Sequence, residues 1–372
     1  MTASKHTVVL FEDDPNFGLQ IEKTIRKELP TGFCLVRFSP KTMPKTKKVP
    51  PDEAYEDRIR KEFLAQPYKD AALIVSDRDL SRTGSYPGLS EAVISKIAAE
   101  LGIPICLYAR GVGNDQLERL RNWSDSRIIL DSSSPEHMAN QIAVIATGFL
   151  DVTMQLTKTL LKKGKARPTT PAAVMAHVLG YPESTDTVSL YGSGDQKMAA
   201  EILPYAQKGA AGRKNLEKRL PCLFGYWLYD SILRYPGLLV NEVAAASYLN
   251  IDVDTFQSDT KIRRLFASAV YKGPFHDKGD VHWWRSKLDD LLADAGCEDG
   301  CSLVEKRLKR KIKSCQCSID PKRKAGWYCM VTKKPVSLQN SRGNISWFPQ
   351  GADLARINKK DFEQIGPWLG LF

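Results

Sequence analysis

Three carboxylates stand at the ends of two apolar runs near the start of the chain. Glu12 and Asp13 follow the run at residues 8–11, and Asp77 follows the run at residues 72–76. Short apolar runs of this kind are typical of buried parallel strands. The carboxyl ends of such strands meet at one edge of an open α/β sheet. Three carboxylates gathered there can hold Mg²⁺ and accept a phosphoryl group, so Glu12, Asp13 and Asp77 are the candidate metal ligands.

The elements that must position these acids alternate between strands and helices. This alternation predicts a flavodoxin-like α/β domain with a five-stranded parallel sheet. A first-turn proline, Pro135, is expected to open a last, long helix over residues 135–163. Beyond the two runs above, the sequence predicts strands at residues 32–38, 103–108 and 127–130, helices at 52–66, 90–101 and 114–123, and a Pro/Lys-rich insert at 40–51.

Residues 5–145 resemble the receiver domain of two-component response regulators. Glu12 and Asp13 match the metal-binding acidic pair of that family, and Asp77 matches its phospho-accepting aspartate. The segment 76–80, followed by Gly84 and Gly88, resembles the phosphorylation loop of the family. The resemblance implies Mg²⁺ as cofactor, a two-component or phosphorelay-like setting, and a bacterial source.

Two positions depart from the receiver pattern. Ala109 stands where the family carries the Ser or Thr that senses the phosphoryl group. Asp131 and Ser132 stand where the family carries Lys and Pro, so an anion replaces the cation that neutralises the acyl phosphate. We therefore interpret residues 1–145 as a degenerate receiver used for recognition. The alternative is a generic flavodoxin-like domain whose acids merely end strands.

Length and composition limit what else the chain can be. Its 372 residues suffice for two or three domains, and 42% hydrophobic residues are ordinary for a globular protein. It has no apolar stretch near the roughly 18 residues that span a bilayer and no apolar signal-peptide core, so we expect a cytoplasmic protein without a membrane partner. The formal net charge of +11 favours polyanionic partners, and basic residues cluster at 41–48, 158–167, 213–219 and 306–313.

Five of the eight cysteines lie close together near the end of the chain. Disulfides are rare in the cytosol, and four thiolates can build a tetrahedral zinc site. The spacing matches no paired C-x2-C ribbon, so free or packed thiols are the alternative. The candidate Zn²⁺ ligands are Cys301, Cys315, Cys317 and Cys329.

Beyond the receiver-like region we expect an exit helix and linker at 146–170, a mainly helical domain at 171–295, and a small α+β unit at 296–372. In that last unit the pattern predicts a strand at 326–331 and short helices at 352–357 and 359–365.

Residues 237–295 resemble a winged helix. Residues 242–256 have the pattern of a helix-turn-helix, in which Asn250 takes the left-handed conformation and Asp252 or Asp254 caps a second helix running to Phe266. Residues 269–273 and 281–284 would form the two strands of the wing. The candidate nucleic-acid-binding residues are Lys261, Arg263 and Arg264 on the second helix and Lys309, Arg310 and Lys311 in the basic run.

Two readings of the basic positions remain open. The run at 306–313 is either a phosphate-contacting segment or the solvated face of a helix. Asp252, Asp254 and Asp259 on or near the second helix argue against DNA reading, because phosphates repel them, and winged helices also serve as protein-interaction modules.

Three functions are therefore compared. The first is a signalling or regulatory protein whose degenerate receiver recognises a protein partner, such as a histidine-kinase-like ATPase, in a bacterial conflict or defence system. The second is a DNA-binding response regulator acting through the winged helix. The third is a receiver-gated effector nuclease. The sequence shows no nucleophile with a nearby base, no Walker motif and no zincin motif, which disfavours an enzyme.

Overall fold

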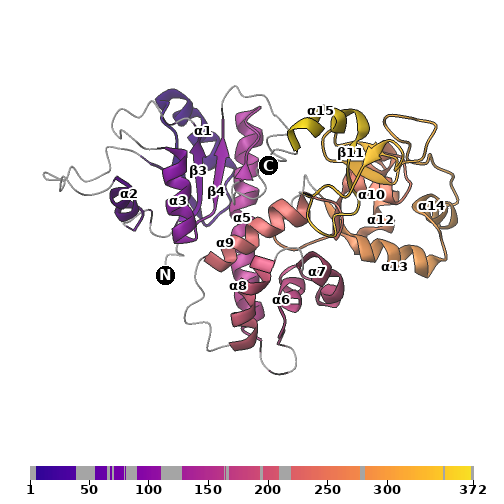
Figure 1. The fold of residues 1–372 in the computed structure, drawn as a ribbon, viewed down its shortest axis with the longest axis horizontal. Coiled ribbons are helices and arrows are strands. Elements are labelled where there is room, and N and C mark those ends of the chain that lie inside the picture. The colour runs from indigo at the N-terminus through magenta and orange to yellow at the C-terminus, as the bar shows by residue number, and fades with distance from the viewer. Residues whose placement is uncertain are drawn as a thin grey trace, which may run out of the picture. The chain divides into compact units, whose positions relative to one another are not determined.

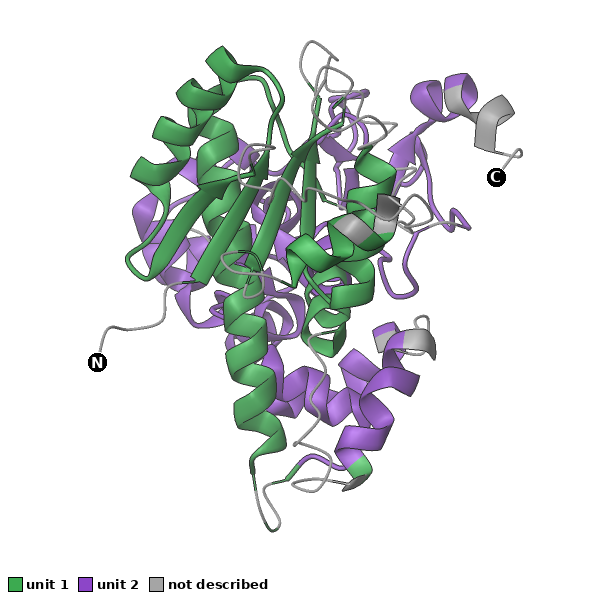
Figure 2. Cartoon of the chain, turned by 90° about the vertical axis from the view of Figure 1, so that its left-hand side faces the viewer, with its two compact units in different colours: residues 1–167, 207–226 green, residues 168–206, 227–372 purple. Residues whose placement is uncertain are grey.

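The structure is a computed structural model (Figure 1), and the chain divides into two compact units (Figure 2). Unit 1 comprises Met1–Arg167 and Gln207–Tyr226, and unit 2 comprises Pro168–Ala206 and Trp227–Phe372. The described residues are 6–38, 55–64, 68, 71–78, 80, 90–109, 128–162, 164, 167–192, 196–208, 219–276, 281–346 and 348–369.

Unit 1 is built on a five-stranded parallel sheet of order β2-β1-β3-β4-β5. This is the strand order of the flavodoxin-like fold, so the predicted fold class of the N-terminal region is confirmed at that level. The strands are β1 (His6–Phe11), β2 (Phe33–Arg37), β3 (Ala71–Asp77), β4 (Ile105–Tyr108) and β5 (Ile128–Ile129).

The helices of unit 1 begin at the capping residues that the sequence offers. Asp14 caps α1 and is followed by Pro15, whereas Ser90 caps α3 and Ser134 caps α5 ahead of Pro135. The helices are α1 (Pro15–Glu28), α2 (Tyr55–Phe63), α3 (Glu91–Leu101), α5 (Pro135–Leu160) and α9 (Arg219–Tyr226).

Successive side chains of each strand point to opposite faces of the sheet. Val9, Phe11 and Ile74 belong to one buried cluster with Ile59 of α2 and Ile97 of α3. The intervening residues of β1 and β3 are also fully buried, and α1 packs against α5. Helices on both faces explain why these strands are continuous apolar runs.

Several sequence predictions fall on residues outside the described part of unit 1. These are the insert at 40–51, the helix at 114–123, and Asp79, Gly84 and Gly88 of the segment compared with a phosphorylation loop.

Unit 2 contains a helical segment, a two-stranded pairing and a four-stranded sheet. Its first part holds α6 (Pro171–Val178), α7 (Thr185–Gly192), most of α8 (Gln196–Lys208) and a π-helix (Trp227–Leu233). The later elements are β6 (Leu239–Asn241), α10 (Glu242–Tyr248), α11 (Val253–Ser258), α12 (Thr260–Leu265), β7 (His282–Trp284), α13 (Arg285–Ala295) and α14 (Gly300–Leu308).

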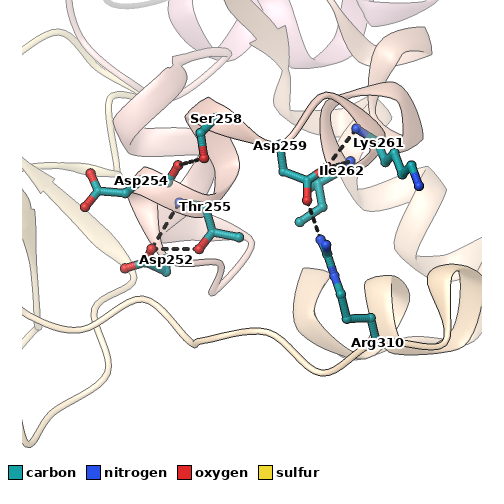
Figure 3. A network of polar contacts seen from close by, with 8 residues as sticks. All are labelled: Asp252, Asp254, Thr255, Ser258, Asp259, Lys261, Ile262 and Arg310. Carbon is teal, nitrogen blue, oxygen red and sulfur yellow. Dashed lines mark hydrogen bonds and ion pairs between the residues drawn. The ribbon is translucent and has the colours of Figure 1, made fainter.

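The helix pair at 242–265 has the predicted turn but not the predicted second helix. Asn250 has a φ of 56°, and Asp252 caps α11 by accepting from the Thr255 amide. The second helix is interrupted at Asp259, whose carboxylate accepts from the amides of Lys261 and Ile262 and starts α12 (Figure 3). The single helix to Phe266 was wrong because Asp259 competes for backbone amides within the helix.

The predicted pairing of two wing strands also needs correction. β7 pairs antiparallel with β6, with Val240 opposite Trp283. Residues 269–273 contribute only an isolated bridge between Val270 and Trp283 and a hydrogen bond from the Tyr271 amide to the His282 carbonyl. β7 therefore lies between β6 and Val270.

The end of unit 2 forms a four-stranded sheet of order β10-β11-β8-β9 that packs on α10. The segment 352–357, predicted as a helix, instead contributes to a strand that pairs parallel with β8. Sheet pairing here overrides a weak local pattern. The elements are β8 (Trp327–Cys329), β9 (Pro335–Val336), β10 (Ser341–Arg342), β11 (Ala355–Asn358) and α15 (Lys359–Leu369).

None of the helices in the described part of the chain is long and apolar enough to cross a membrane.

Candidate functional site

An acidic cluster lies at the carboxyl edge of the parallel sheet. Glu12 and Asp13 follow β1 directly, and Asp77 is the last residue of β3. Because β1 and β3 are neighbours with Phe11 opposite Ser76, the two strand ends deliver their acids side by side. The three residues each offer a carboxylate oxygen, and these oxygens lie within 4.8 Å of one another.

The cluster is largely removed from solvent. Asp77 is 1% exposed and Glu12 is 5% exposed, whereas Asp13 is half-buried. Concentrating three carboxylates in such a place is costly unless positive charge compensates them. Three oxygen donors of this kind suit a hard divalent cation such as Mg²⁺, which is bound through a few carboxylates and completes its shell with water. The residues therefore fit a divalent metal site.

Glu12 is held by hydrogen bonds to both of its carboxylate oxygens. The Tyr108 hydroxyl donates to Oε2 over 2.7 Å, and the Asp14 amide donates to Oε1 over 2.8 Å. Tyr108 ends β4, is fully buried, and lies opposite Asp77 in the sheet register. These two donors are uncharged, so they hold the Glu12 carboxylate in place without contributing a positive charge.

Arg37, the last residue of β2, fixes the loop that carries the acids. Its guanidinium donates to the backbone carbonyls of Glu12 and Asp14, both over 3.1 Å, and to the Pro15 carbonyl over 3.4 Å. Gly18 of α1 makes room for it, because a Cβ there would lie 2.3 Å from the guanidinium carbon. Arg37 of the neighbouring strand β2 thus anchors the loop between β1 and α1 by hydrogen bonds.

The two positions that depart from the receiver pattern lie where the sequence register put them. Ala109 follows β4 directly, and its carbonyl accepts a hydrogen bond from the Ser132 hydroxyl over 2.7 Å. Asp131 follows β5, accepts from the Ser133 amide over 2.9 Å, and lies 3.8 Å from the His137 ring nitrogen. The carboxylate of Asp131 therefore lies beside the His137 ring, and the comparison of this position with the lysine of receiver domains stays a prediction.

The four candidate zinc ligands do not form a comparable cluster. The described residues include all eight cysteines. Among these described residues, Glu12, Asp13 and Asp77 are the only group of three or more potential ligands whose atoms lie within 4.8 Å of one another. Cys301 donates to the Asn250 carbonyl over 2.9 Å, whereas Cys329 accepts from the Asn358 amide over 3.4 Å. Burial raises the pKa of Cys301 to about 11 and that of Cys315 to about 12. The Zn²⁺ site stays a prediction.

Three of the six predicted nucleic-acid-binding residues form ion pairs, and five of the six are exposed. Arg263 lies 3.1 Å from Glu242, and Arg310 lies 2.5 Å from Asp259. Lys311 is 3.9 Å from Glu305, with both side chains largely in solvent. The exposed members are Lys261, Arg264, Lys309, Arg310 and Lys311.

Sequence reasoning identified the acids but not the residues that hold them. Tyr108 and Arg37 entered the sequence predictions only as parts of the strands expected at 103–108 and 32–38. Each acts across the sheet on a residue of β1 or its following loop, so finding them requires the strand order and register. A polar residue ending an otherwise apolar strand, as both do, is the one local signal available.

No family model matches this chain, and no curated protein matches it either.

Proposed function

We propose that this chain is a signalling or regulatory protein whose unit 1 binds Mg²⁺ and recognises a protein partner. The proposal rests on the cluster of Glu12, Asp13 and Asp77 at the carboxyl edge of a sheet with the flavodoxin-like strand order. The proposed partner is a histidine-kinase-like ATPase, in a bacterial conflict or defence system, and the proposed compartment is the cytoplasm.

Recognition without a phosphoryl switch is favoured by the two departures from the receiver pattern. Ala109 has no hydroxyl with which to contact a phosphoryl group on Asp77. Asp131 places a carboxylate where a lysine would neutralise that group, and like charges repel. Bound Mg²⁺ then serves to neutralise the acids and fix the loops of this edge, which is the surface offered to the partner.

Two measurements on the full chain test this function. Calorimetric titration with Mg²⁺ should show binding by the wild type and weaker binding by Asp77→Asn, because an amide replaces a carboxylate ligand. Incubation with acetyl phosphate and Mg²⁺, followed by intact mass spectrometry, should give no phosphoryl adduct.

Partner capture separates recognition from switching. At a Mg²⁺ concentration that saturates both proteins, a kinase-like ATPase should co-purify equally with the wild type and with Asp77→Asn, which lacks an acceptor. Capture that requires both Asp77 and a phosphodonor would overturn the proposal in favour of a working receiver, and the absence of Mg²⁺ binding would remove its basis.

A winged-helix-like arrangement of residues 237–295 is our second proposal. It is supported by β7 lying between β6 and Val270, beside the helix-turn-helix of α10 and α11. The central strand carries Trp283, which is buried against Phe256 of α11 with ring centroids 5.3 Å apart. An experimental structure of the full chain would test it through the chain path of residues 277–280.

A further inference from the structure

The most strongly charged part of the chain lies outside the acidic site. Residues 306–324 contain nine basic residues and one acidic residue, so they supply most of the formal net charge of +11. All nine basic side chains are exposed, and three of them form ion pairs with other described residues. The segment contains no aromatic residue.

The backbone of this segment leaves the helical conformation after Leu308 and is then tied to neighbouring turns by hydrogen bonds. α14 ends at Leu308, and Lys309 caps it in the left-handed conformation with a φ of 55°. The Lys313 carbonyl then accepts from the Asp252 amide over 3.0 Å, and the Cys315 amide donates to the Asn250 carbonyl over 3.3 Å. Residues 309–313, here called the basic strap, are therefore tied to the turn before α11.

A second contact ties the basic strap to α12. Arg310 of the strap pairs with Asp259, the residue that caps α12 (Figure 3). This pair lowers the pKa of the Asp259 carboxyl, chiefly through the hydrogen bond from Arg310. It also neutralises the acid nearest the start of α12, where Lys261 is exposed. The contact between Arg310 and Asp259 thus joins the basic strap to α12, and both segments carry exposed cations.

We propose that the basic strap and the exposed side chains of α12 form one binding surface for the phosphate backbone of duplex DNA. The cations assigned to this surface are Lys261, Arg264, Lys309, Lys311 and Lys313. The inference concerns unit 2 and goes beyond the function proposed for unit 1.

The composition of the surface indicates this partner. Lysine is depleted at protein interfaces, which favour aromatic residues, whereas clustered lysine and arginine are typical of nucleic-acid-binding surfaces. Single-stranded nucleic acid is usually held by stacking on aromatic side chains, and residues 306–324 have none. Asp254 is exposed on α11 and would be repelled by phosphates, so the strap and α12, not α11, face the backbone.

The test is fluorescence anisotropy of the full chain with a labelled duplex of random sequence, over 50 to 200 mM salt. The strap variant is Lys309→Gln with Lys311→Gln and Lys313→Gln. The matched control is Lys23→Gln with Lys27→Gln and Lys158→Gln, which removes three exposed charges from helices of unit 1. Each lost phosphate contact should lower the log–log salt slope by about 0.9, so the strap variant should lose roughly 2 to 3.

The two triple variants give opposite outcomes under the proposal. The strap variant should bind weaker than wild type by about tenfold or more at the higher salt, and the control should bind as the wild type does. Equal loss in both variants would mean that net charge alone attracts DNA and would overturn the proposal. Equally tight binding of single-stranded RNA or polyglutamate would overturn the choice of partner.

Asp259→Asn tests the contact between strap and helix directly. Asparagine caps a helix as well as aspartate does, so α12 keeps its start while Arg310 becomes available to a phosphate. Binding should tighten and the salt slope should steepen by about 0.9. Asp186→Asn, an exposed acid of α7, is the control and should leave binding unchanged. Unchanged or weaker binding by Asp259→Asn would contradict the assigned surface.

Discussion

The hydrogen bond from Tyr108 to Glu12 fixes one carboxylate of the acidic site from a different strand. It joins β4 to the end of β1 across the intervening strand β3, which itself carries Asp77. A buried hydrogen bond to an ionised group contributes about 1.5–3 kcal/mol. Tyr108 is therefore a positioning residue that keeps one carboxylate of the cluster in place.

Tyr108→Phe should lower the free energy of unfolding by about 1.5–3 kcal/mol, because Glu12 loses a buried donor. Mg²⁺ should restore part of this loss, since a bound cation compensates the same carboxylate. Urea unfolding with and without Mg²⁺ measures both effects. In a double-mutant cycle with Glu12→Gln, a coupling energy near zero would show that the hydrogen bond does not carry the effect.

At the residue scale, helix caps and turn residues could be predicted from the sequence, whereas hydrogen bonds between strands could not. Asn250 and Asp252 were identified from their types and neighbours, because capping and left-handed turns involve only a few adjacent residues. Tyr108 and Arg37 act on residues far along the chain, which sequence spacing does not reveal.

At the element scale, α9 is part of unit 1 although it lies beyond α6, α7 and α8 in the sequence. Its Tyr226 hydroxyl accepts from the Ile105 amide over 2.6 Å and donates to the Ile105 carbonyl over 3.2 Å. The Tyr226 ring also packs edge-on against Phe149 of α5. α9 therefore closes the start of β4, at the opposite end of the strand from Tyr108.

Tyr226→Phe should destabilise unit 1 by about 1–3 kcal/mol, because two buried backbone groups of Ile105 lose their partner. Hydrogen exchange of the β4 amides should accelerate, whereas the amides of β8 and β11 in unit 2 provide an internal control and should be unaffected. Equal acceleration in both units would contradict a local role for this hydroxyl.

The strands of unit 1 and the short elements of unit 2 differ in how well sequence pattern predicts them. Buried parallel strands are continuous apolar runs, and β1 and β3 were found from that signal alone. β11 has four residues, too few for a period, and its pairing with β8 decided its conformation. α11 and α12 are separated by one capping aspartate, so a composition that favours helix overall could not locate the break.

At the scale of the whole molecule, the chain enters each unit twice. The predicted exit helix and linker span residues 146–170, and the first passage from unit 1 into unit 2 falls at Pro168. The return of residues 207–226 to unit 1 was not predicted from the sequence. It is defined by packing within unit 1 and not by a linker composition. The third boundary lies within a continuous helical stretch, where α9 is followed directly by the π-helix.

That π-helix contains a buried acid, Asp230, which should make the stability of the molecule depend on pH. Burial raises the pKa of Asp230 to about 7 from an ordinary value of 3.8, and Arg234 at 3.6 Å only partly opposes this. The folded state therefore holds a proton that the unfolded chain has already released between about pH 4 and 7. Stability from this group is complete below pH 4, falls as pH rises, and is lost above pH 7.

Asp230→Asn removes this titration, so the free energy of unfolding of the variant relative to wild type should increase from pH 5 to pH 8. The increase should have a slope of up to about 1.4 kcal/mol per pH unit. Tryptophan fluorescence during urea unfolding is a suitable readout, because six of the seven tryptophans belong to unit 2. Asp186→Asn changes an exposed acid, and its difference from wild type should stay constant. A constant difference for Asp230→Asn as well would show that Asp230 is already ionised in the folded protein at pH 5.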